Sequence, residues 1–94
     1  MLVRIHDLSL GGCLIEAPFN VEIGRRITLH LDLPGEGRLV VQAEIVRLRA
    51  NYGFAVKFVD VDKDIRGRLE RALERLLAVS PGEDWTLDGG LNGV

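Results

Sequence analysis

The stretch Asp7-Leu8-Ser9-Leu10-Gly11-Gly12 places the strongest constraint on the fold, because it separates two apolar segments, residues 2–6 and 13–17. Short Asp and Ser side chains bond to nearby backbone amides, and paired glycines allow positive φ angles. The stretch is therefore predicted to be an exposed turn between two antiparallel strands. Such a turn can serve the fold alone, or it can also bind a ligand.

Alternation of apolar and polar residues predicts strands on both sides of this turn and beyond it. Ile27, Leu29, Leu31 and Leu33 give the clearest alternation, and the segment 34–37 contains Pro and Gly, which favour a hairpin turn. In the next segment the apolar phase changes after Ile45, which indicates a β-bulge of the kind that turns corners in small barrels. The expected strands are residues 2–6, 12–17, 26–33, 38–49 and 53–59.

A helix is predicted after the last of these strands. Asp62 is a suitable N-cap, and the helix is expected to reach about Val79 with an apolar stripe on one face. The alternate Asp residues at 60–64 do not form a calcium loop, because Ile65 stands where such a loop needs Gly. Residues 1–79 are therefore expected to form the domain, and residues 80–94 a flexible Gly-rich tail with Trp85 as a docking anchor.

Composition excludes several classes of protein. The chain of 94 residues is 47% hydrophobic and 28% charged with a formal net charge of −2, which indicates one globular domain without general attraction to nucleic acids. One cysteine allows no internal disulfide, and no segment has the length of a membrane span or the pattern of a signal peptide. We expect a cytoplasmic protein that binds neither nucleic acid nor membrane.

The chemistry-bearing residues predict no enzyme. His6 and His30 are expected on exposed strand faces without a nucleophile or acid arranged for catalysis, and Cys13 is expected in the core. No spacing of His, Cys, Asp or Glu predicts a metal site. Catalytic residues, metal ligands and cofactors are therefore all expected to be absent.

The spacing of Asp7, Ser9 and Gly12 is DxSxxG, and with the alternation that follows it resembles the signature of PilZ domains. The resemblance continues through Gly24, the Pro34-Gly35 turn, residues 52–58 and the helix after Asp62, and covers about residues 2–78. It implies a mainly β fold, a small antiparallel split β-barrel with a C-terminal α-helix. The family closes its barrel with six strands, of which five are found here. It also implies a non-enzymatic bacterial receptor for the nucleotide cyclic di-GMP.

By this resemblance the ligand-binding residues are Asp7, Ser9, Gly11 and Gly12, which contact a guanine and the backbone near it. The family's second motif, RxxxR, lies one strand upstream and grips phosphates, but only six residues precede Asp7 here. Auxiliary anion contacts are expected from Arg4, Arg47 and Arg49. Arg71 and Arg75 also spell RxxxR, but on a helix among acidic residues, and they receive no such role.

Two functions follow from this half-complete motif. The first is cyclic di-GMP binding that is weakened by roughly a hundredfold to ten-thousandfold, since each lost bond to a charged group costs ~1.5–3 kcal/mol. The second is a nucleotide-independent adaptor that binds a protein partner. Five strands leave a barrel open, so either the tail around Trp85 and Leu87 folds back over the gap or a second copy covers it. A homodimer is expected, with residues 2–5 or the helix stripe at the contact.

Overall fold

The fold was obtained as a computed structural model, which describes residues 2–17, 20–33, 35–49, 53–79 and 87–92. Within these ranges the secondary-structure elements are β1 (Leu2–His6), β2 (Gly12–Glu16), β3 (Arg26–Leu33), β4 (Gly37–Arg49), β5 (Gly53–Val59), α1 (Lys63–Val79) and β6 (Leu87–Asn92). The five strands expected from the sequence are present with ends that agree to within one residue. The helix expected after Asp62 is also present.

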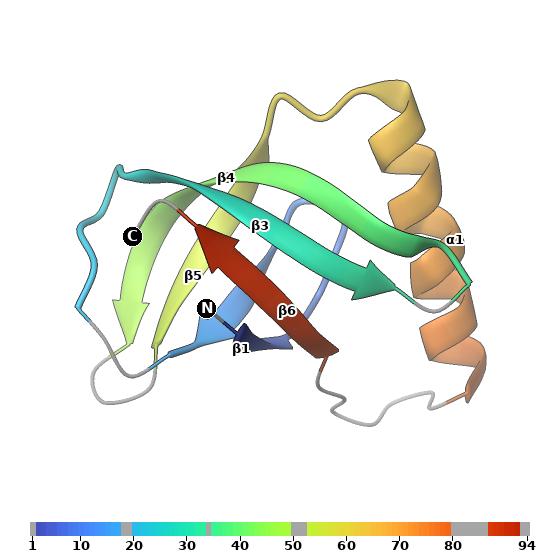
Figure 1. The fold of residues 1–94 in the computed structure, drawn as a ribbon, viewed down its shortest axis with the longest axis horizontal. Coiled ribbons are helices and arrows are strands. Elements are labelled where there is room, and N and C mark those ends of the chain that lie inside the picture. Colours follow the sequence, from blue (N-terminus) through green and yellow to red (C-terminus); the bar gives the residue numbers. More distant parts are fainter. Residues whose placement is uncertain (1, 18–19, 34, 50–52, 80–86, 93–94) are drawn as a thin grey trace.

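All strand pairs are antiparallel, and the strands close into a barrel in the order β1-β2-β5-β4-β3-β6. Figure 1 shows β6 crossing between β3 and β1. The sequence predicted a flexible tail over residues 80–94, whereas residues 87–92 form this sixth strand, so the domain does not end at residue 79. Trp85 lies outside the described residues. Since β6 fills the gap, the open barrel from which a homodimer was expected is not observed.

The barrel interior is filled by the apolar residues that alternate along the strands. Ile27, Leu29 and Leu31 of β3 are at most 1% exposed, and the polar residues between them are half-buried or exposed. The predicted bulge is confirmed in β4, where the register with β5 shifts between Ile45 and Arg47. Inside the barrel the largest fully buried side chains are Phe54, Ile5, Ile15, Ile27, Leu29, Leu31, Leu39, Ile45 and Val41.

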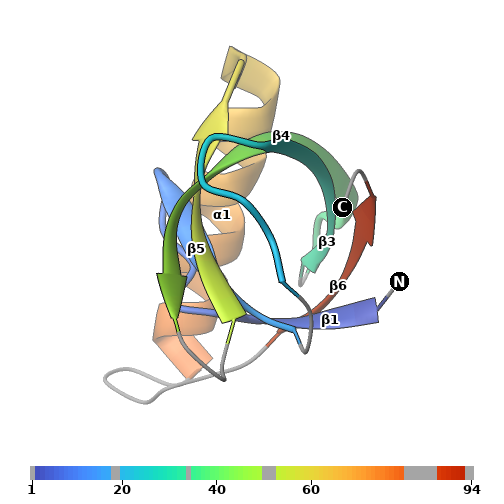
Figure 2. The same ribbon diagram turned by 90° about the vertical axis from the view of Figure 1, so that its left-hand side faces the viewer.

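Helix α1 lies across one end of the barrel, as Figures 1 and 2 show from two directions. Leu69 and Ala72 are fully buried in the barrel core cluster, and Ile65, Leu73 and Leu76 pack against that cluster with part of their surface exposed. The N-cap prediction is confirmed, because the Ile65 amide donates a hydrogen bond of 2.9 Å to the Asp62 carboxylate. The apolar stripe of the helix therefore closes this end of the core.

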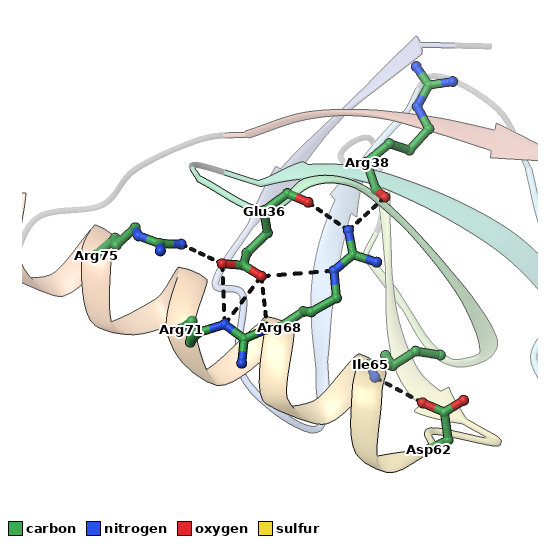
Figure 3. Close-up of polar contacts among 7 residues, drawn as sticks. All are labelled: Glu36, Arg38, Asp62, Ile65, Arg68, Arg71 and Arg75. Atoms are coloured by element: carbon green, nitrogen blue, oxygen red, sulfur yellow. Dashed lines mark hydrogen bonds and ion pairs between the residues drawn. The ribbon is translucent and has the colours of Figure 1, made fainter.

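A polar contact also holds α1 to the barrel (Figure 3). The Glu36 carboxylate, in the β3–β4 turn, accepts bonds from Arg71 at 3.1 Å and Arg75 at 2.7 Å, while the Arg68 guanidinium donates to the backbone carbonyls of Glu36 and Arg38. Hydrogen bonds from Arg71 and then Arg75 lower the pKa of Glu36 to about 2. Arg71 and Arg75 thus join α1 to the β3–β4 turn, and neither lines a ligand site.

Candidate ligand-binding site

The Asp7–Gly12 turn is shaped by its own hydrogen bonds. Asp7 has a φ of 50°, in the left-handed region that Asp tolerates better than most residues. The Ser9 amide donates to the Gly12 carbonyl at 2.9 Å, and the Gly11 amide donates to the Ser9 hydroxyl oxygen at 3.3 Å. Leu8 is buried in the core and anchors the turn. Asp7, Ser9 and Gly11 are left exposed.

Gly12 is required by the close approach of two strands. A Cβ atom at this position would overlap the carbonyl oxygen of Val56 on β5, whereas a Cβ at Gly11 would meet no atom within 4 Å. The Phe58 amide also donates to the Gly11 carbonyl at 2.8 Å, which ties the turn to the end of β5. The last position of DxSxxG therefore serves the packing of β2 on β5, and that packing fixes where Asp7 and Ser9 lie.

The bulge in β4 decides where two arginines point. Ile45 pairs with Val56 and faces the core, so in a regular strand Arg47 would face the core as well. The extra residue pairs Arg47 with Ala55 instead and shifts Arg49 in the same way. Both arginines are exposed on the outer face of the barrel, which is the face that the Asp7–Gly12 turn borders.

These elements surround one open hollow of about 280 Å³ on the outer face. The structure therefore brings together Asp7, Ser9, Gly11, Gly12, Arg47 and Arg49. Arg4 does not line the hollow; it is exposed on β1 and pairs with Glu16 and Asp88 in register. The full lining is Asp7, Ser9, Gly11, Gly12, Cys13, Leu14, Arg47, Arg49, Ala55 and Val56.

Four lining residues were not predicted as site residues: Cys13, Leu14, Ala55 and Val56. Of these, Leu14 and Ala55 lie outside the core cluster. They are partners in the β2–β5 register, and Leu14 is only 7% exposed although it lies outside the core cluster. Their outward direction could have been predicted from the alternation alone, because Leu14 and Ala55 each lie between two core residues of their strand. They add apolar surface to the lining of the hollow.

The charges around the hollow favour an anion that also carries hydrogen-bond donors. Two guanidinium groups, of Arg47 and Arg49, outnumber the single carboxylate of Asp7. Guanidinium groups present planar pairs of donors that suit phosphate, and a carboxylate accepts bonds from N–H groups. Beside the hollow the carboxylate of Glu16 is held by His6 at 2.8 Å.

Cys13 gives the lining a thiol, but not a reactive one. Cys13 is buried, and burial raises its pKa to about 12, so its thiol stays protonated near neutral pH. Among the residues that the structure describes, no three His, Cys, Asp or Glu side chains are grouped to hold a metal ion. Within the same residues no helix is long and apolar enough to cross a membrane.

Comparison with known protein families gives one match that spans most of the chain. The model of the PilZ domain matches residues 1–75, which include the turn, the bulge and most of α1. Searches of curated proteins and of solved structures give no match. The matched range covers both sides of the hollow, Asp7–Gly12 and Arg47–Arg49. This chain therefore belongs to the PilZ domain family.

Proposed function

We propose that this chain is a signalling domain that binds cyclic di-GMP in the hollow, with an affinity below that of a complete PilZ site. PilZ domains are non-enzymatic receptor and adaptor domains, so the family makes the chain a signalling module of the cyclic di-GMP class and not an enzyme. The observation that carries the proposal is the meeting of Asp7 and Ser9 with Arg47 and Arg49 around one hollow. The cytoplasm is the proposed compartment.

The chemistry of the ligand supports this assignment. Guanine has N–H donors on one edge and the acceptors O6 and N7 on another, and phosphate oxygens accept bidentate bonds from arginine. The Asp7 carboxylate is suited to the donor edge, and Arg47 and Arg49 to O6, N7 or phosphate. Leu14 and Ala55 offer an apolar surface to the face of a base.

The affinity is expected to be weak because few arginines are available to bind the ligand. In the described residues two arginines line the hollow, both from β4. A site with a further arginine pair makes additional bonds to charged groups, each worth ~1.5–3 kcal/mol, or a factor of roughly 10 to 150. We therefore expect dissociation constants in the micromolar range or weaker.

A titration of the ¹⁵N-labelled chain with cyclic di-GMP, followed by NMR, tests the proposal. The amides of Ser9, Gly11, Gly12 and Ala55 should shift, because they lie at the hollow. Asp7→Ala, Arg47→Ala and Arg49→Ala should each weaken binding by about 10-fold to 150-fold. Arg26→Ala is the matched control, since Arg26 is exposed on β3, pairs with Asp60 at 3.1 Å and does not line the hollow.

The possible outcomes separate the parts of the proposal. No shift at millimolar cyclic di-GMP contradicts nucleotide binding. Equal losses in Arg26→Ala and Arg47→Ala contradict the placement of the ligand in the hollow. Submicromolar binding that is lost in Asp7→Ala supports the site and contradicts the weakened affinity.

A nucleotide-independent adaptor is the second candidate, and exposed apolar side chains on β4 favour it. Val46 and Leu48, which flank Arg47 on β4, are 41% and 50% exposed. Exposed aliphatic side chains that are grouped on a surface are typical of protein contacts. If the NMR titration shows no nucleotide binding, this surface is the place to test with Val46→Ser and Leu48→Ser once a partner protein has been isolated.

A further inference from the structure

The position of β6 in the barrel carries a second inference, which does not depend on nucleotide binding. β6 pairs with β1 on one side and with β3 on the other, and these pairings close the barrel. Without β6 the remaining strands form an open sheet, β1-β2-β5-β4-β3, with β1 and β3 at its edges. The two edges define a slot that accepts one strand antiparallel to both neighbours.

The sequence of β6 is a weak strand former. Four of its residues, Asp88, Gly89, Gly90 and Asn92, belong to types that are depleted in strands. Gly89 and Gly90 lie in its middle, opposite Leu2 and Val3 of β1 and opposite His30 and Leu31 of β3. Glycine contributes no side chain to the pairing, so the backbone ladders on both sides carry much of the attachment.

The number of residues between α1 and β6 is enough for β6 to pair with another molecule. Residues 80–86 join α1 to β6, and a chain of this length spans about 25 Å when extended. The protein measures 34 × 28 × 20 Å, so this reach is comparable with its shorter dimensions. A strand from a second copy makes the same backbone bonds in the slot, and exchange of an identical element is a low-cost route to a dimer.

We propose that β6 exchanges between two copies of the chain, so that a homodimer forms in which each slot holds the partner's β6. Exchange leaves no edge of β1 or β3 exposed, whereas departure of β6 without replacement exposes both. The dimer contact then includes residues 2–5, which is one of the two segments predicted from the sequence to form a homodimer contact. The second copy is the occupant because it alone is certain to carry this strand in this register.

Two variants of the full chain, each with one cysteine added to the native Cys13, test the exchange. Arg4 and Asp88 are partners in the β1–β6 register. Directly opposite residues of an antiparallel pair lie within the Cα distance that a disulfide needs. When Arg4→Cys and Asp88→Cys are mixed and oxidised, a disulfide at this register can join the two variants only across an exchanged strand. The buried Cys13 thiol stays protonated and should not compete.

The expected result is a covalent heterodimer whose yield relative to monomer rises about tenfold for each tenfold increase in free monomer concentration. A mixture of Arg4→Cys with Glu74→Cys, an exposed helix position, is the matched control and should give no comparable product. The double variant Arg4→Cys/Asp88→Cys should form its bond within one chain at high dilution. If the double variant forms this disulfide while the mixture of Arg4→Cys and Asp88→Cys gives no heterodimer, exchange is contradicted. If the double variant forms no disulfide, the β1–β6 register is wrong, and the proposal is contradicted as well.

Discussion

Truncation of Leu69 tests how α1 is attached to the barrel. Its side chain is 0% exposed and lies in the core cluster with residues of β3, β4 and β5. Leu69→Ala removes three carbon atoms from a closed core, which costs ~2–5 kcal/mol for leucine at such sites. The higher helix propensity of alanine offsets only a few tenths of this. We expect a loss of about 3 kcal/mol in the free energy of unfolding, and a melting temperature lowered by ~10–25 °C.

Urea unfolding followed by far-ultraviolet circular dichroism measures this loss, with the slope m as a check that the transition stays two-state. Glu74→Ala is the matched control, because Glu74 is an exposed residue of the same helix and its truncation should change stability by less than ~0.5 kcal/mol. A loss below ~1 kcal/mol for Leu69→Ala, or one equal to that of the control, would refute the conclusion that Leu69 joins α1 to the core.

Three further predictions concern the cap, the turn and the acid response. Asp62→Ala should cost ~1 kcal/mol in urea unfolding because the Ile65 amide loses its acceptor, and Asp62→Asn should restore most of this. Gly12→Ala should cost ~1–3 kcal/mol because its Cβ overlaps the Val56 carbonyl, whereas Gly11→Ala, with open space, should be close to neutral. The pKa of Glu36 is lowered from 4.5 to about 2, so its stabilisation is present above pH 4.5 and is lost as the pH falls toward 2. Glu36→Gln should flatten the fall in stability over this range, and Glu70→Gln, which removes an exposed carboxylate of α1, should not.

Local patterns predicted most of the fold because each of the first five strands and the helix carries a signal in its own stretch of sequence. Strict alternation marked β3, the phase change after Ile45 marked the bulge, and Asp62 marked the start of α1. β6 could not be found in this way, since a strand with two central glycines has neither alternation nor β propensity. It is a strand because the edges of β1 and β3 lie on either side of it, which is a property of the whole barrel.

Part of the candidate site could likewise be predicted from the sequence, and part of it could not. The DxSxxG spacing located the turn, and two arginines at alternate positions of a strand were expected on one face. The sequence could not show that this face borders the turn, because the β2–β5 and β4–β5 registers decide it. Nor could it show that Arg4 lies outside the hollow, or that Glu36 meets Arg71 and Arg75 across a long stretch of chain.

The place of β6 in the strand order also affects the order in which the strands can pair during folding. Ile5 of β1 pairs with Leu87 of β6, so the second edge of β1 is covered only when β6 has paired with it. Residues 87–92 are synthesised after β1–β5 and α1, so the edges of β1 and β3 that pair with β6 stay uncovered until these residues are available. Contacts between segments so far apart in sequence also form slowly, because the long intervening chain loses entropy when it is closed. We therefore expect closure of the barrel to be a late step of folding, and association between chains to be strongest before it.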